Sequence, residues 1–312
     1  MSGGTFPAPL AQPMRRAVRL EWWNIAWTIS IVGVMGLVLG QSQTMKTAWI
    51  EDMLGLVPPA MFLIAARFET RHGRSARFPF GFERVNGLGF FVAAVALTAV
   101  GAFLLYDAAM TLVTAEHATV GSVRLFGHDI WLGWLMMGAQ IYAIIPPLII
   151  GRKELPLAEA LQDKLLHTDA LMNKANWMTG VAGLAGIVGL GLGWWWADSV
   201  AAAAISFSVL NDGINALRSS TAELVDGAPR RLSSADLSED AEAVKASLET
   251  AFPGAEVRLR ETGRLIRAEV HGTLPPAEAL PPSTYWPNEE DRAWRLAQVS
   301  FVPPAEKDDG AR

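Results

Sequence analysis

A short run of polar residues near the middle of the chain, HTDALMNKANWM at 167–178, has the composition of a cation site. On a helix, residues at i, i+3, i+4 and i+7 share one face. Asp169, Met172, Asn173 and Asn176 have this spacing. The run leads into a long apolar stretch, so this face would lie inside a bundle of apolar helices.

A second polar face is predicted earlier in the chain, where Glu51, Gly55 and Pro58 are spaced for one side of a helix. Two such faces in contact would enclose a small polar pocket between packed helices. A hard or borderline divalent cation prefers carboxylate oxygen, amide oxygen and water. Glu51, Asp52, Asp169 and Asn176 can supply carboxylate and amide oxygens. The candidate metal ligands are Glu51, Asp52, Asp169, Met172 and Asn176.

Three residues of the run have alternative interpretations. Met172 supplies a soft thioether, but a methionine on a spanning helix more often serves packing between helices. His167 is either an interfacial residue or a proton-accepting group at the inner mouth of the site. Lys174 opposes a cation unless its side chain points away from the pocket.

The elements that must hold this pocket are predicted to be membrane helices. The chain is 51% hydrophobic and 18% charged, against roughly 25% charged in soluble proteins. It has no cysteine, which excludes disulfides and thiolate metal sites, and its net charge of -5 does not suggest nucleic acid. A helix needs about 20 mainly apolar residues to cross a bilayer. The segments that qualify are 22–40, 48–66, 85–113, 129–151, 169–192 and 194–217.

Basic residues alternate between the predicted loops, and cytoplasmic loops carry the excess of lysine and arginine. Arginines and lysines concentrate before the first segment, after the second and after the fourth, whereas the other loops hold only Lys46 and Arg124. We therefore predict an integral, multi-pass protein with both termini in the cytoplasm. The predicted parts are a cytoplasmic tail at 1–20, a six-span domain at 21–222 and a cytoplasmic domain at 223–312.

The last part of the chain has the pattern of a small α/β domain. An amphipathic helix is predicted within 233–252, with a cap-type start. Alternating residues in 255–261 and 264–272 predict two strands joined by a turn at Thr262-Gly263, and a last strand is predicted near 297–302.

Several stretches resemble the cation diffusion facilitator family. FPFGFERVNGL (78–88) is similar to the segment that enters the third span, GWWWADSVAAAAIS (193–206) to the turn before the sixth, and ELVDGAP (223–229) to the entry into the cytoplasmic domain. The resemblance implies a six-helix transmembrane bundle with a C-terminal ferredoxin-like domain. It also implies a homodimer, in the plasma (inner) membrane, that exchanges a divalent cation for protons and holds no resident cofactor.

The resemblance also implies where the transported cation binds. The family pattern of His or Asp followed by Asp four residues later, on the second and fifth spans, falls here on Glu51 and Gly55 and on Met172 and Asn176. We therefore expect a membrane cation transporter, not an enzyme, with an altered site that does not specify zinc. The alternatives are a non-transporting regulatory or scaffold subunit that pairs with an active homologue, and a transporter of protons or a monovalent ion.

Overall fold

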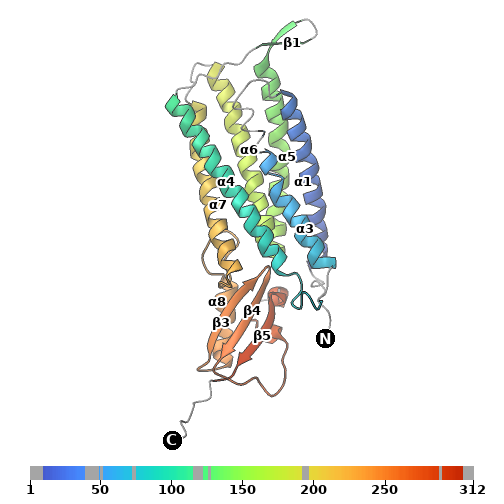
Figure 1. Cartoon of the computed structure of the whole chain (residues 1–312), viewed down its shortest axis with the longest axis vertical. Helices are drawn as coiled ribbons and strands as arrows, with labels where there is room; N and C mark the ends of the chain where they lie inside the picture. Colours follow the sequence, from blue (N-terminus) through green and yellow to red (C-terminus); the bar gives the residue numbers. More distant parts are fainter. Residues whose placement is uncertain are drawn as a thin grey trace.

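The computed structural model describes residues 10–38, 49, 52–71, 75–114, 122–125, 128–191, 197–287 and 290–304. Long helices lie side by side in a bundle, and a small domain with a β-sheet is attached to one end of it (Figure 1). We call this end of the bundle the domain end. The long helices are α1 (Ala11–Val38), α3 (Val57–Arg71), α4 (Arg84–Thr114), α5 (Leu132–Leu161), α6 (Lys164–Gly191) and α7 (Ala197–Leu224).

These helices coincide with the six predicted segments, although their ends differ. Within the described residues, two of them are long and apolar enough by themselves to cross a membrane, over Arg84–Thr114 and Trp134–Leu161. The prediction of a helical bundle joined to a small α/β domain is therefore confirmed. Six membrane crossings remain a prediction.

The second predicted segment is not one continuous helix. Residues 52–54 form a helical turn, the chain turns at Gly55 and Leu56, and α3 begins only at Val57. Pro58 and Pro59 then occupy the first turn of α3, where a missing N–H costs no helical hydrogen bond.

In α5 the helix continues through Pro146, Pro147 and Pro156 to Leu161, well past the predicted end at residue 151. The start of α5 follows directly on an antiparallel pair of strands, β1 (Ser122–Leu125) and β2 (His128–Trp131). Figure 1 shows β1 at the end of the bundle that is far from the small domain. Residues 129–131, predicted as the start of a span, are thus strand.

Glycines let α4 and α7 approach each other closely. A Cβ atom on Gly101 would lie 2.6 Å from the backbone nitrogen of Leu210, and one on Gly213 would lie 2.8 Å from the Cα of Thr98. Small residues at helix contacts allow this close packing in membrane bundles.

The C-terminal domain follows its prediction closely. α8 (Glu239–Ala251) starts at the N-cap Ser238 and packs on a sheet of β3 (Glu256–Thr262), β4 (Leu265–His271) and β5 (Leu296–Val302). β3 and β4 form the predicted antiparallel hairpin, and β5 pairs parallel to β4.

A ferredoxin-like domain has the order β-α-β-β-α-β. Between β4 and β5, in the place of its second helix, the described residues hold two 3-10 turns, Pro282–Tyr285 and Glu290–Arg295. The domain therefore keeps the helix, the hairpin and the last strand of the ferredoxin-like order.

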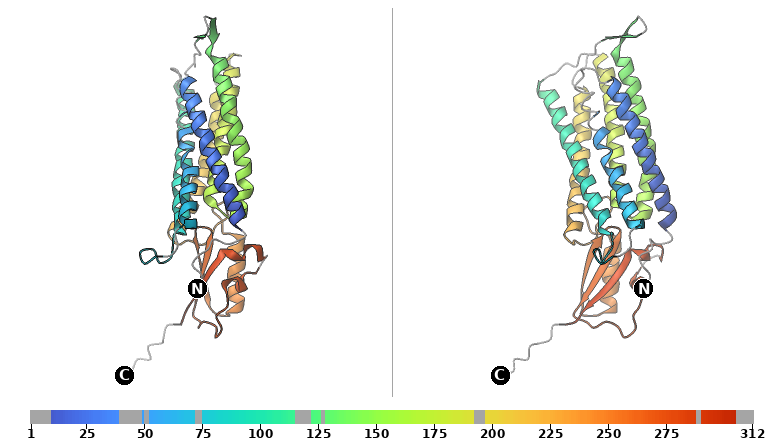
Figure 2. Two further views of the ribbon diagram at one scale, coloured as in Figure 1. Left: turned by 90° about the vertical axis from the view of Figure 1, so that its right-hand side faces the viewer. Right: turned by 45° about the vertical axis from the view of Figure 1, so that its right-hand side comes forward.

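The tip of the β3–β4 hairpin is buried against the domain end of the bundle (Figure 2). Gly263 has φ +60°, a conformation that glycine adopts without strain, and its N–H donates to Glu223 of α7 at 2.9 Å. The next residue, Arg264, pairs with Asp163 between α5 and α6 and with Glu69 of α3. Burial lowers the pKa of Arg264, but the two carboxylates outweigh that effect and hold its pKa above the ordinary value.

Candidate cation site

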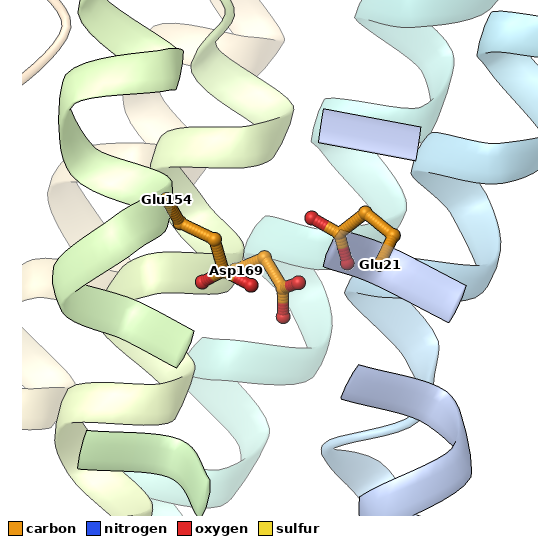
Figure 3. A group of neighbouring side chains, drawn as sticks. All are labelled: Glu21, Glu154 and Asp169. Atoms are coloured by element: carbon orange, nitrogen blue, oxygen red, sulfur yellow. The ribbon is translucent and has the colours of Figure 1, made fainter. Parts of the chain in front are cut away.

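Three acidic side chains from three helices meet inside the bundle. Glu21 of α1, Glu154 of α5 and Asp169 of α6 each offer a carboxylate oxygen, and these oxygens lie within 4.8 Å of one another. Figure 3 shows the three carboxyl groups converging from their helices. We call these three residues the carboxylate cluster. Glu21 and Glu154 are 0% exposed and Asp169 is 1% exposed.

The helical repeat brings Glu21 into the interior. The buried positions of α1 are spaced alternately by three and four residues, and Glu21, Asn24 and Thr28 continue the line of Met14 and Ala17. Such a stripe faces the core of a bundle. The polar residues of α1 therefore point inward, while Trp22 and Trp23, the residues next to Glu21, are exposed.

Glu154 and Asp169 are placed by the same rule on their helices. Glu154 lies on the buried line of α5 with Ile150, Ala158 and Leu161. The helix must continue past residue 151 for this to happen, because only then does Glu154 complete another turn on the inner face. Asp169 lies one turn after the buried Leu165 on α6.

Two asparagines hold part of the carboxylate cluster in place. The amide nitrogen of Asn24 donates to Glu154 Oε1 at 3.3 Å and to Asp169 Oδ2 at 3.0 Å. The amide nitrogen of Asn173, one turn after Asp169, donates to Glu154 Oε2 at 3.0 Å. Among the described residues, no hydrogen-bond partner reaches the remaining oxygens, which are both of Glu21 and Oδ1 of Asp169.

Charge balance decides what the carboxylate cluster can do. Buried charges are costly unless they are paired, and carboxylates that share a site do not all ionise together. The three oxygens without donors therefore need a cation or bound protons. A hard cation with oxygen ligands at about 2.4 Å spans oxygen pairs up to about 4.8 Å apart, and the three oxygens lie within this limit. The all-oxygen ligand set is typical of hard divalent ions.

The structure separates the residues that the sequence grouped on one face of α6. Asp169 belongs to the carboxylate cluster, and Asn176, two turns further along, has a buried side-chain oxygen without a hydrogen-bond partner among the described residues. Met172 instead lies in an apolar cluster with Leu97 and Val209, against which Leu54 packs. The Met172 side chain thus packs between helices near the second segment, which is the second of the two roles considered for it.

The other predicted ligands are placed only in part. Asp52 is half-buried on the helical turn before α3, and Glu51 lies outside the described residues. A pocket between the second and fifth segments therefore stays a prediction. Lys174 is exposed, so its side chain points away from the polar face, which is the alternative that leaves room for a cation.

His167 lies on another face of α6. It lines a cavity of about 20 Å³ between α6 and α7 with Thr168, Asp212 and Ser219, close to Ser233 of the linker that precedes α8. A cavity of this size holds about one water molecule. Its role as a proton relay remains a prediction, because His167 is not part of the carboxylate cluster.

Sequence reasoning missed Glu21 and Glu154. Both stand at the predicted edges of spans, close to basic residues that indicate an interface, and Glu21 is also followed by two tryptophans. The signal that could have found Glu21 is the spacing of Glu21, Asn24 and Thr28 at i, i+3 and i+7, which continues an otherwise apolar stripe. Glu154 gives no comparable signal, because Arg152, Lys153 and Pro156 favour a loop.

A bundle of long apolar helices with carboxylates and amides gathered in its interior defines a membrane protein that handles cations. The family comparison agrees with this class. The model of the cation efflux transmembrane domain matches residues 24–225, more than half of the chain, and the chain belongs to the cation diffusion facilitator family. It is thus a membrane protein and a cation transporter in general terms, and the family is generally not enzymatic. No individual curated protein matches the chain.

Proposed function

We propose that the protein exchanges a hard divalent cation for protons, and that the carboxylate cluster binds the cation on its way through the bundle. The observation that carries the proposal is the meeting of three fully buried carboxylates from α1, α5 and α6 within 4.8 Å. Polar residues continue from the cluster along α6 through Asn173 to Asn176. The predicted site of Glu51, Asp52, Met172 and Asn176 would then lie further along the same path.

Proton coupling follows from the same charge balance. With no cation bound, the buried cluster needs protons to limit the repulsion between its carboxylates. A cation supplies that compensation, so its binding displaces protons. Binding sites between helices that rock against each other are typical of secondary transporters. The basic residues of the loops predict that the domain end, which holds the cluster, faces the cytoplasm.

The test uses the full chain in liposomes with a pH-sensitive dye inside, supplied with magnesium, manganese, cobalt or zinc. Glu154→Gln keeps the side-chain shape but removes one charge. Substituting a residue that only hydrogen-bonds to a metal ligand costs about 10- to 100-fold in metal affinity. Because Glu154 is a proposed ligand itself, we expect at least a tenfold loss of uptake and of proton movement. Glu159→Gln is the matched control, because Glu159 is exposed on the same helix.

Two results separate the possible sites. If Glu154→Gln transports normally while Glu51→Ala does not, the cation binds between the second and fifth segments and the carboxylate cluster is not on its path. If the wild-type protein neither binds nor moves any of the four ions, the proposal fails. Binding is measured separately by calorimetry in detergent, so that loss of transport and loss of binding are distinguishable.

One observation favours the alternative of a non-transporting subunit. Met172 stands where the family pattern has a ligand, and it is 1% exposed within an apolar cluster. A chain that binds a cation at the carboxylate cluster without moving it would support this alternative. Family members generally act as dimers, and we propose a homodimer here as well.

A further inference from the structure

A large groove lies between α1 and α3 at the domain end of the bundle. Its volume is about 890 Å³, within the roughly 300–1,000 Å³ that is usual for ligand pockets. The residues that line it are Met14, Arg15, Val18, Arg19, Trp22, Trp23 and Ala26 of α1, and Leu63, Ala66 and Arg67 of α3. The groove is separate from the carboxylate cluster, because Glu21 lies on the inner face of α1 and Trp22 lines the groove.

The lining of the groove changes character along its length. All three arginines, with Met14, lie in the part of the groove toward the domain end, whereas Ala26 and Leu63 lie deeper in the bundle. At 1.5 Å per residue, Trp22 lies about 10 Å further along α1 than Arg15. Cationic groups at one end and apolar groups at the other match an amphiphile with an anionic head.

Charge and exposure favour such an occupant. Three arginines and no acidic residue line the groove, in a chain whose net charge is -5. Trp22 is 61% exposed and Trp23 is 58% exposed. Exposed tryptophans at this position are typical of the membrane interface, where the ring meets the lipid headgroups. Basic pockets between transmembrane helices bind anionic headgroups.

We propose that the groove between α1 and α3 binds an anionic phospholipid of the leaflet at the domain end, which the loop charges predict to be cytoplasmic. Arg15, Arg19 and Arg67 would hold the phosphate, and the acyl chain would lie along Ala26 and Leu63. The lipid would bridge α1, which carries Glu21, to α3, which Arg264 ties to the C-terminal domain. This inference does not depend on the proposed transport activity.

Native mass spectrometry of the full chain in an uncharged detergent tests the proposal, with phosphatidylglycerol and phosphatidylcholine as probes. The wild type should retain phosphatidylglycerol at least about tenfold better than phosphatidylcholine. Each basic residue near a membrane surface contributes about fivefold to the binding of anionic lipid, so Arg15→Gln, Arg19→Gln and Arg67→Gln together should weaken it on the order of 100-fold. Replacing the same three arginines by lysine keeps the three charges and should retain most of the preference for phosphatidylglycerol. Retention in this variant would also show that the bundle folds without the three arginines.

The matched control removes three charges from the same end of the bundle, outside the groove, with Arg152→Gln, Lys153→Gln and Arg218→Gln. It should keep the lipid preference. An equal loss in the control would show general surface attraction and would overturn the proposal, as would equal retention of the two lipids by the wild type.

Two further arms identify other occupants. Glycerol phosphate has a similar anion without acyl chains, and full competition by it would mean a site for free anions. The chain has no natural cysteine, so Ala26→Cys introduces a single one at the exposed edge of the groove. A disulfide-linked dimer of this variant that excludes phosphatidylglycerol would mean that a second copy of the chain covers the groove. Either result would refute the lipid proposal.

Discussion

Replacing Arg264 by methionine should loosen the junction between the C-terminal domain and the helices. The Arg264 side chain is 5% exposed, and its guanidinium pairs with the fully buried Asp163 and with Glu69. Its Nε also donates to Asp163 Oδ2 at 2.8 Å. The substitution keeps an apolar stem of similar length but leaves the carboxylates of both Asp163 and Glu69 without their counter-charge.

The size of the effect follows from the partners that Asp163 retains. Removing one partner of a buried ion pair costs about 3–5 kcal/mol. Asp163 Oδ1 still accepts from the N–H groups of Leu165 and Leu166 at 2.9 and 3.0 Å, and its Oδ2 from Asn86 at 3.1 Å. The cost for Arg264→Met should therefore be near the lower limit, about 3 kcal/mol. For a large domain this corresponds to a fall of about 6–12 °C in the unfolding midpoint.

The assay is thermal unfolding of the full chain in detergent, followed by tryptophan fluorescence. Arg258→Met is the control, because Arg258 lies in the same hairpin and pairs with Glu256 at the surface, where an ion pair is worth about 0–1 kcal/mol. Adding Asp163→Asn to Arg264→Met should recover part of the loss, since asparagine still caps α6 but carries no charge. The reasoning is refuted if the control falls as far as Arg264→Met, or if Asp163→Asn lowers the midpoint further.

The raised pKa of Arg264 also predicts how the effect of Arg264→Met depends on pH. The pKa of Arg264 is raised, so the stability that it contributes is fully present below its ordinary pKa and is lost only as pH rises through the higher folded value. Between pH 6 and pH 9 Arg264 stays charged. In the variant, the carboxylates left without a counter-charge can only lose protons as pH rises. The difference in midpoint between the wild type and Arg264→Met should therefore not fall over that range, and a difference that halves by pH 9 would contradict the assignment.

Two further predictions concern packing and ligand binding. Gly101→Ala should lower the unfolding midpoint, because its Cβ would meet the backbone of Leu210 at 2.6 Å. Gly138→Ala is the control and should be near neutral, because a Cβ at Gly138 meets nothing within 4 Å. Equal effects in the two variants would contradict the close contact of α4 and α7. A transported divalent ion at 100 times its dissociation constant should stabilise the wild type by about 2.7 kcal/mol, and the same ion concentration should stabilise Glu154→Gln far less than Glu159→Gln. Equal stabilisation of these two variants would exclude the carboxylate cluster as the binding site.

Much of the fold could be predicted because its elements follow simple periods. The sequence of β3 and β4 alternates apolar and polar residues, and α8 has a capped start and an apolar stripe, so these elements were predicted within a few residues. The bundle helices were predicted from apolar length alone. Length does not define helix ends, because the end of a helix depends on what its last turns pack against. This is why α5 continues to Leu161.

The candidate site was predicted only at Asp169, for a related physical reason. Charged residues near the end of an apolar stretch usually face water or lipid headgroups, and Arg152 and Lys153 do remain exposed. Glu154, the next residue, turns inward because the helix continues and Asn173 and Asn24 meet its carboxylate. Hydropathy does not describe contacts of this kind, which join residues of different helices, 130 positions apart for Asn24 and 19 for Asn173.

The start of α6 connects the two polar structures of the bundle. Asp163 caps this helix and is bound by Arg264 of the C-terminal hairpin, while Asp169 lies six residues later, about 9 Å along the same axis. If cation binding at Glu21, Glu154 and Asp169 shifts α6 relative to α1, the shift acts close to this cap. Because the first turn of α6 is fixed to the hairpin, such a shift moves the hairpin as well. The C-terminal domain would therefore change the affinity of the carboxylate cluster, and cation binding would change the position of the domain by the same free energy of coupling.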